Sequence, residues 1–307
     1  MLKYLVIGAG GTGGSIGAYM TEAGKDVTLI ARGEHLRQIQ EHGLRMETAK
    51  KGDYVINPIK ATDMDHYDER PDIIFVCVKS YSLEDTIPFI RRVEKENTIV
   101  IQILNIYGSG GRMQKKLPDL LVTDGCIYIV SEIKEPGTIL IRGDIFRIVY
   151  GVRDPKELRP ELLEVAKDLK DSGIDGVLSD NIRRDALQKF AFVSSMAACG
   201  FYYHVFAGGV QITGEPRDTF VKLMKEIDAL AVAMEVPFLV DIVTTNLQML
   251  DTLNPETSTS MQRDIYAGKS SEIDGLIYEV ERLGRQYGVP TPTYTMVADK
   301  ARADGLH

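Results

Sequence analysis

The sequence has few cysteines, few histidines and no excess of positive charge. Its three cysteines, Cys77, Cys126 and Cys199, lie far apart and form no C-x-x-C pair, which excludes a disulfide framework and predicts a reducing, cytoplasmic location. The five histidines lack metal-ligand spacing, so no metal site is expected. A net charge of −8 at pH 7 argues against general nucleic-acid binding, which requires a basic surface.

Long apolar runs are also missing. Met1-Leu2-Lys3 leads directly into an apolar run at residues 4–7, which is too short for a targeting signal or a membrane span, so no membrane partner is expected. The chain has 307 residues, of which 44% are hydrophobic and 26% are charged. This is the composition of an ordinary globular protein, and the length allows two domains.

The first 32 residues carry the most informative pattern. An apolar run at 4–7, a glycine-rich turn, a helical segment at 15–22 and a second apolar run at 27–30 give the order of one βαβ unit. The turn, Gly8-Ala9-Gly10-Gly11-Thr12-Gly13, has G-x-G-x-x-G spacing. Such glycines permit a tight turn, close approach of a pyrophosphate and close helix packing, and the N–H groups at the helix start bind phosphate. We therefore predict a dinucleotide site here, with an ordinary glycine turn as the alternative.

The end of the second run indicates which dinucleotide binds. An NAD site carries an acid about 20 residues after the glycines, where it binds the ribose 2′-hydroxyl. Here Ala31-Arg32-Gly33 occupies that place, and the first acid is Glu34. A guanidinium suits a 2′-phosphate, so Arg32 favours NADPH/NADP+. A solvated surface arginine is the alternative.

The first half of the chain alternates between strand and helix patterns. Apolar runs at 72–78 and 98–104 are typical of buried parallel strands, a helix is expected over 34–42, and another begins at Ser82 or Thr86 with Pro88 in its first turn. Together these predict an α/β fold with a Rossmann-like, doubly wound sheet. Three further runs, at 126–130, 138–141 and 146–150, are separated by turn residues and predict added antiparallel strands.

Residues beyond 179 are expected to be all-α. Helical patterns cover 182–198, 216–235, 240–253 and about 271–287. We predict a dinucleotide-binding domain over 1–179 and a helical substrate-binding and catalytic domain over 180–307, with the substrate in a cleft beside the carboxyl ends of the strands.

Two polar residues follow predicted strands at that edge. Lys79 ends the run at 72–78, where it can bind a cofactor or substrate anion, or remain a solvated lysine. Asn105 ends the next run, where its amide can donate to a substrate oxygen or to the nicotinamide ribose. A local Asx turn is the alternative for Asn105.

Three residues of the second half are further candidates. Lys189 shares an apolar helical stripe with Val193, and a partly buried lysine suits a general acid; an ion pair with Asp185 is the alternative. From local pattern alone, Ser260 is a helix N-cap and Glu272 a partner of a helix dipole.

These motifs resemble the ketopantoate reductase family over nearly the whole chain. The resemblance rests on Gly8–Gly13, Leu29–Gly33, Val78–Tyr81, Pro136–Ile139, Lys189-Phe190, Ser260–Asp264, Glu272–Gly275 and Gly288–Pro292. It implies that Lys189 is the catalytic lysine and Glu272 the essential acid. It further implies that Ser260 and Asn105 bind the substrate, while Arg32, Lys79 and the glycine turn, with Asn105, bind the cofactor.

The chain departs from the family at several positions. The family has Gln-Asn-Gly where Leu104-Asn105-Ile106 stands, and Asn where Val193 stands. It often has Asn-Pro where Ala197-Ala198 stands. These changes predict a more hydrophobic wall along the face of Lys189, which discriminates against substrates only weakly. Ser194 or Ser195 is a candidate replacement for the lost amide.

The resemblance implies NADPH-dependent reduction of 2-dehydropantoate to D-pantoate in pantothenate and coenzyme A biosynthesis. The alternatives are a reductase of a less hydroxylated 2-oxo acid and a non-catalytic NADPH-binding regulator. The expected partner is a small 2-oxo acid, and a homodimer is left open.

Overall fold

The first of two units comprises residues 1–104 and 108–182 in the computed structural model, which describes residues 1–306. His307 lies outside the described residues. The elements of unit 1 are β1 (Lys3–Ile7), α1 (Gly11–Glu22), β2 (Asp26–Ile30), α2 (Gly33–His42), β3 (Leu44–Thr48), β4 (Gly52–Ile56), β5 (Lys60–Thr62), β6 (Ile73–Val76), η1 (Ser80–Ser82), α3 (Leu83–Val93), β7 (Ile99–Gln102), α4 (Ser109–Lys116), β8 (Leu121–Glu135), β9 (Thr138–Gly151), η2 (Pro155–Glu157), α5 (Pro160–Asp171) and β10 (Asp175–Leu178).

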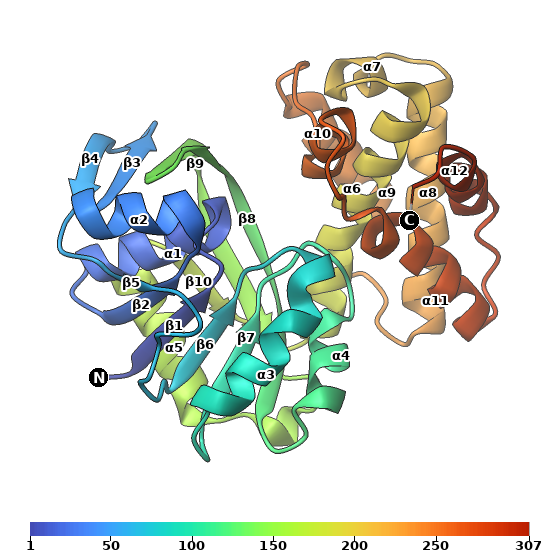
Figure 1. Ribbon diagram of the computed structural model, residues 1–307. Coiled ribbons are helices and arrows are strands. Elements are labelled where there is room, and N and C mark those ends of the chain that lie inside the picture. The colour runs from blue at the N-terminus through green and yellow to red at the C-terminus, as the bar shows by residue number, and fades with distance from the viewer. Residues whose placement is uncertain (307) are drawn as a thin grey trace. The chain divides into compact units, whose positions relative to one another are not determined.

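The strands form one mixed sheet in the order β4-β3-β9-β8-β7-β6-β1-β2-β5, with β10 beside β9 (Figure 1). At its centre β2, β1, β6 and β7 are parallel: Ile7 lies opposite Ile30 and Val76, and Val76 lies opposite Gln102. These strands therefore end at one edge of the sheet, and the glycine turn, Arg32 and Lys79 follow at that edge. The Rossmann-like arrangement predicted from the alternating pattern is confirmed.

Helix α1 packs on the sheet through glycines. A Cβ atom at Gly13 would lie 2.2 Å from the Gly8 carbonyl oxygen, at Gly14 2.1 Å from Ile139 Cδ1, and at Gly17 2.2 Å from Leu29 Cδ2. No larger side chain fits at these positions without displacing a neighbour. The glycines of α1 therefore set how closely the helix approaches the strands.

The antiparallel region differs from the prediction. Two long strands, β8 and β9, replace the three short ones, and they pair antiparallel along most of their length. Gly143, predicted to lie in a turn, has a φ of +73° inside β9. There the register shifts, because Tyr128 faces Arg147 while Val130 faces Arg142. The turn residues therefore form a bulge within one strand.

Two other local predictions are corrected. Helix α3 begins at Leu83, so Pro88 lies inside the helix and not in its first turn. Strands β3, β4 and β5 are not among the predicted strands. β3 alternates between buried and exposed residues but has only five residues, β4 is largely exposed and β5 has only three residues.

Unit 2 comprises residues 105–107 together with the chain from Arg183 onward. Its described elements are all helical: α6 (Ile182–Tyr203), α7 (Ala207–Gln211), α8 (Glu215–Ala233), α9 (Ile242–Thr252), α10 (Ser260–Tyr266), the π-helix η3 (Asp274–Tyr278), α11 (Glu279–Tyr287) and α12 (Pro292–Ala303). Within the described part of the chain, no helix is both long and apolar enough to cross a membrane. The assignment of a nucleotide role to one unit and a substrate role to the other stays a prediction.

Candidate active site

The glycine turn connects β1 to α1, and its backbone lies close to that of neighbouring strands. Gly8 has a φ of +96°, and a Cβ there would lie 3.0 Å from the Cys77 carbonyl oxygen. The Ile30 carbonyl accepts hydrogen bonds from the Gly8 and Ala9 N–H groups at 3.2 and 2.9 Å. These contacts hold the turn against the ends of β2 and β6, which is the edge where doubly wound sheets bind ligands.

The start of α1 fits a phosphate group. The first bond of the helix runs from Gly14 N to Gly10 O at 2.8 Å, so the N–H groups of Gly11, Thr12 and Gly13 precede the hydrogen-bond ladder. The first turn contains no acidic side chain. A Cβ built at Gly10 would meet no atom within 4 Å, and this open space is where a pyrophosphate can approach the backbone.

Arg32 is exposed at the N-cap position of α2, directly after β2. The nearby acid, Glu34, accepts hydrogen bonds from Arg37 at 2.6 and 2.8 Å and from Gln38 at 2.8 Å. The bonds from Arg37, followed by the one from Gln38, lower the pKa of Glu34 to about 2. The acid that follows Arg32 is therefore ionised and already engaged by its own helix.

His35 is a residue of this edge that the sequence did not single out. Its Nε2 lies 2.8 Å from the Ala9 carbonyl oxygen, and the Gly137 N–H donates to its Nδ1 at 2.9 Å. Because Nδ1 accepts, the proton of the neutral ring is on Nε2 and donates to Ala9. Burial lowers the pKa of His35, an effect opposed by the Ala9 hydrogen bond. A neutral imidazole thus joins the glycine turn to the connection between β8 and β9.

Lys79 lies between β6 and η1, where it is partly buried. This is the strand end at which it was predicted. The three cysteines are free, and burial raises the pKa of the Cys77 thiol. Among the described residues no group of histidine, cysteine and acidic side chains could hold a metal ion.

In unit 2, Lys189 and Asn105 are brought together. The Lys189 ammonium donates to Asn105 Oδ1 at 2.5 Å, and both residues are partly buried. The two residues are 84 positions apart in the sequence. The segment 105–107 leaves β7 and packs with the helices, where Tyr107 and Phe190 have ring centroids 6.1 Å apart. The strand-end asparagine is thus part of the helical unit.

Glu272 directly precedes a helical turn that packs on the same segment. It is 4% exposed and directly precedes Ile273, the first residue of the helical stretch that continues into η3. A Cβ at Gly275 would lie 2.4 Å from Ile106 Cγ2, so the turn after Glu272 packs directly on the residue after Asn105. The structure therefore gathers Lys189, Asn105 and the Glu272 turn around residues 105–107.

Ser260 is not a helix N-cap. Thr259 caps α10, and Gln262 completes a capping box with it. Gln262 also donates to the Val205 carbonyl at 2.9 Å, which places α10 near the C-terminal end of α6. The substrate-binding role of Ser260 stays a prediction.

The serines that follow Val193 face inward. Ser194 and Ser195 are fully buried, with hydroxyl oxygens 2.7 and 3.4 Å from the Tyr294 hydroxyl. They therefore do not replace a polar group on the face of Lys189. Val193, one turn after Lys189, is partly exposed, while Ala197 and Ala198 are buried.

Two family models match this chain. The family model "Ketopantoate reductase PanE/ApbA" matches residues 4–155, and "Ketopantoate reductase PanE/ApbA C terminal" matches residues 181–304. A 2-dehydropantoate 2-reductase of Pyrococcus horikoshii is 27% identical over 92% of this chain and 91% of its own.

Two solved structures share the fold. The 2-dehydropantoate 2-reductase of Methylococcus capsulatus has a TM-score of 0.88 at 24% identity, covering 98% of this chain and 96% of its own. A D-mandelate dehydrogenase, solved with NADH and anilino(oxo)acetate, has a TM-score of 0.87 at 23% identity, covering 98% of this chain and 97% of its own.

Two glycines of the turn should respond differently to substitution by alanine, one in NADPH binding and the other in stability. Gly10→Ala should fold normally, because Gly10 has a φ of −71° and a Cβ there meets no other atom. It should raise the Kd for NADPH about tenfold or more, because the added methyl group blocks the approach of the pyrophosphate. Gly13→Ala should cost about 3 kcal/mol of folding free energy, because its methyl group overlaps the Gly8 carbonyl. Fluorescence titration with NADPH and urea denaturation measure the two effects.

Gly111→Ala is the matched control. A Cβ at Gly111, in α4, also meets nothing within 4 Å, so the Kd for NADPH should not change. An unchanged Kd in Gly10→Ala would exclude the turn as the pyrophosphate site.

Proposed function

The chain belongs to the ketopantoate reductase family of oxidoreductases, and from that premise we propose that it uses NADPH to reduce 2-dehydropantoate to D-pantoate. Enzymes of this family are NADPH-dependent and reduce a 2-oxo acid to a 2-hydroxy acid. The observation that carries the proposal for this chain is the hydrogen bond from Lys189 to Asn105, which is 2.5 Å long. The turn after the buried Glu272 packs on the next residue, Ile106.

In this proposal Lys189 supplies the proton. When bound, the reduced nicotinamide supplies a hydride to the ketone carbon of the substrate. The Lys189 ammonium stabilises the negative charge that develops on the ketone oxygen and transfers its proton there, which lowers the energy of the transition state more than that of the substrate complex. Asn105 Oδ1 orients the ammonium, and its amide nitrogen remains a donor for a substrate oxygen.

Glu272 is the second catalytic residue of the proposal. A carboxylate that is 4% exposed must be compensated by donors, and the proposal assigns this part to the Lys189 ammonium and a substrate hydroxyl. Glu272 would thus orient Lys189 or the substrate hydroxyl. Ser260 and Lys79 complete the proposed binding residues, Ser260 for the substrate and Lys79 for the cofactor.

The choice of NADPH rests on Arg32. Its exposed guanidinium follows β2, where the 2′-substituent of the adenosine ribose binds in this fold. Glu34 is held by Arg37 and Gln38, so it does not supply the free carboxylate that an NAD site uses. Both features support binding of a 2′-phosphate.

A second candidate is a 2-oxo acid without the hydroxyl of ketopantoate. Val193 supports it, because this partly exposed apolar side chain lies one turn from Lys189. The similar D-mandelate dehydrogenase was solved with NADH and anilino(oxo)acetate, which supports this candidate. An apolar wall favours such substrates but excludes ketopantoate only weakly.

The role of Lys189 predicts the effect of its removal. Lys189→Ala should lower kcat by about a hundredfold or more. It should leave the Kd for NADPH near the wild-type value, because the variant keeps Arg32 and the glycine turn, the proposed phosphate-binding residues. NADPH consumption at saturating 2-oxo acid measures kcat, and Lys222→Ala, an exposed lysine of α8, is the control. Unchanged turnover in Lys189→Ala would end the assignment.

The role of Arg32 predicts a change in cofactor preference. Arg32→Ala should raise the KM for NADPH about 10- to 100-fold, the effect of losing charged hydrogen bonds, while the KM for NADH changes little. Arg45→Ala, an exposed arginine of β3, should alter neither value. Equal effects on both cofactors would show that Arg32 does not bind the 2′-phosphate.

The two substrate candidates are distinguished by one chemical group. Ketopantoate and 3,3-dimethyl-2-oxobutanoate differ only in the hydroxyl, so the ratio of their kcat/KM values measures recognition of that group. Val193→Asn should shift this ratio about tenfold toward ketopantoate by adding a polar partner. A wild-type preference for 3,3-dimethyl-2-oxobutanoate would replace the first candidate by the second.

A further inference from the structure

The turn that follows Glu272 is a π-helix. Residues Asp274–Tyr278 form η3, which continues directly into α11. A π-helix has i→i+5 hydrogen bonds, is rare, and occurs mostly as a single turn at functional sites. It persists only where the surrounding structure supports it, so the partners of η3 matter for the placement of Glu272.

A buried chain of hydroxyl groups meets η3 from α6. Ser194 Oγ lies 2.6 Å from the Leu276 carbonyl oxygen and 2.7 Å from the Tyr294 hydroxyl. A carbonyl can only accept, so the single proton of Ser194 goes to Leu276. Tyr294 must then donate to Ser194. Ser194 and Tyr294 are fully buried and Leu276 is 1% exposed, so these hydrogen-bonded groups have no access to solvent.

Tyr294 is itself held in place by α8. The Glu226 carboxylate accepts from the Thr293 and Tyr294 N–H groups at 2.7 and 3.1 Å, at the N-terminus of α12. A carboxylate at this end of a helix is favourable because it pairs with free N–H groups. The position of the Tyr294 hydroxyl is thus set by two helices.

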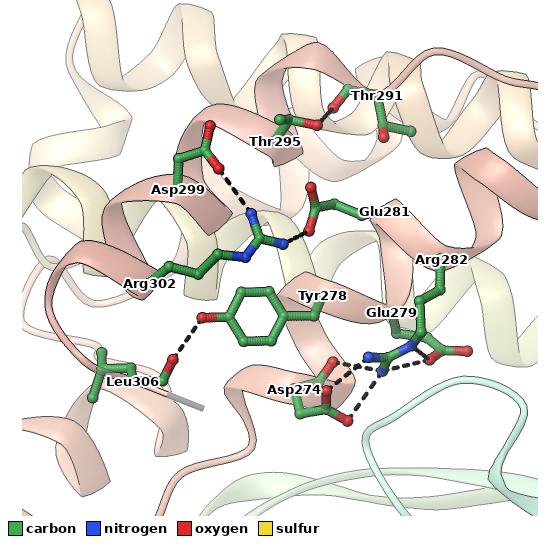
Figure 2. Close-up of polar contacts among 10 residues, drawn as sticks. All are labelled: Asp274, Tyr278, Glu279, Glu281, Arg282, Thr291, Thr295, Asp299, Arg302 and Leu306. Carbon is green, nitrogen blue, oxygen red and sulfur yellow. Dashed lines mark hydrogen bonds and ion pairs between the residues drawn. The ribbon is translucent and has the colours of Figure 1, made fainter.

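Other contacts hold the outer side of η3 (Figure 2). Arg282 bonds Asp274 at 2.7 and 3.0 Å and Glu279 at 2.7 Å, and the Tyr278 hydroxyl donates to the Leu306 carbonyl at 2.6 Å. The Arg302 guanidinium lies 4.9 Å from the Tyr278 ring. These contacts join η3 to α11 and to the C-terminal segment, whereas Ser194 joins it to the helix that carries Lys189.

The Ser194 bond therefore connects the two elements on which the proposed reaction depends. Lys189 precedes Ser194 on α6 by little more than one turn, and Glu272 lies two residues before η3. Within η3, Gly275 packs on Ile106, next to the Asn105 that binds Lys189. A shift of η3 against α6 would move Glu272 relative to Lys189.

We propose that Ser194 is a positioning residue that keeps η3 in its π-helical form and thereby orients Glu272 toward Lys189. The inference rests on the proposed function of Lys189 and Glu272. Without the hydroxyl, the buried Leu276 carbonyl loses the hydrogen bond that Ser194 donates to it, and a hydrogen bond lost in a buried site is costly. Relaxation to α-helical bonding would turn Glu272 by about 100°, the angle of one residue.

Ser195 provides the matched control for the experiment. It is also fully buried on α6 and contacts Tyr294 at 3.4 Å, while the Leu276 carbonyl is bonded by Ser194. We expect Ser194→Ala to lower kcat about 10- to 100-fold with the KM for NADPH within twofold of wild type. Ser195→Ala should keep kcat within about twofold. Both are assayed below the unfolding transition of the less stable variant.

The isosteric pair Ser194→Thr and Ser194→Val gives a second measurement if Ser194→Ala does not fold. Thr keeps the hydroxyl donor and Val lacks it at the same shape, so kcat should be at least about tenfold higher in Thr than in Val. The positioning role is overturned if Ser194→Thr and Ser194→Val have equal kcat. It is also overturned if Ser194→Ala and Ser195→Ala have equal kcat.

Lys189→Ala and Glu272→Gln separate a failure of the positioning role of Ser194 from a failure of the proposed function. If both lose turnover while Ser194→Ala keeps it, the positioning role is wrong and the proposed function stands. If both retain full turnover, the proposed function fails and the positioning role fails with it.

Discussion

The close approach of α1 to the sheet is the constraint on which unit 1 depends. Gly13, Gly14 and Gly17 occupy positions where a Cβ would lie within about 2.2 Å of a neighbouring atom, so the helix axis is nearer the strands than ordinary side chains permit. That distance brings the first turn of α1 to the edge where β1, β2 and β6 end. The N–H groups at the start of α1 are thus held at the edge where the proposed phosphate site lies, and a Cβ at Gly10 would meet no atom within 4 Å there.

In unit 2 the corresponding constraint is that buried polar side chains need hydrogen-bond partners. The Lys189 ammonium, the Glu272 carboxylate and the Ser194 and Tyr294 hydroxyls lie among apolar helices, where an unpaired group is costly. The partners come from distant parts of the chain: Asn105 from the end of a strand, and the Leu276 carbonyl from a π-helix. Buried hydrogen bonds of this kind restrict their members to few arrangements, and the proposed role of Lys189 requires an oriented ammonium.

Local patterns predicted much of the fold, and their failures have physical causes. Helices α2, α6, α8 and α9 and the central parallel strands were found from periodicity, since each signal lies within one segment. The bulge at Gly143 was taken for a turn because glycine with a positive φ serves both structures. The capping role of Thr259 was assigned to Ser260, because adjacent hydroxyl residues are equivalent until the chain direction is known.

The sequence by itself determined the glycine turn, the arginine after β2, the alternation of the central strands with helices and, through its resemblance to a family, the candidates Lys189 and Glu272. Each of these depends on residues that are neighbours in the chain. Only the tertiary structure decided that Asn105 binds Lys189, that His35 holds the glycine turn, that Ser194 faces Leu276 and that η3 is a π-helix. Those features depend on atoms brought together across many residues, and no local pattern records which buried donor will meet which acceptor.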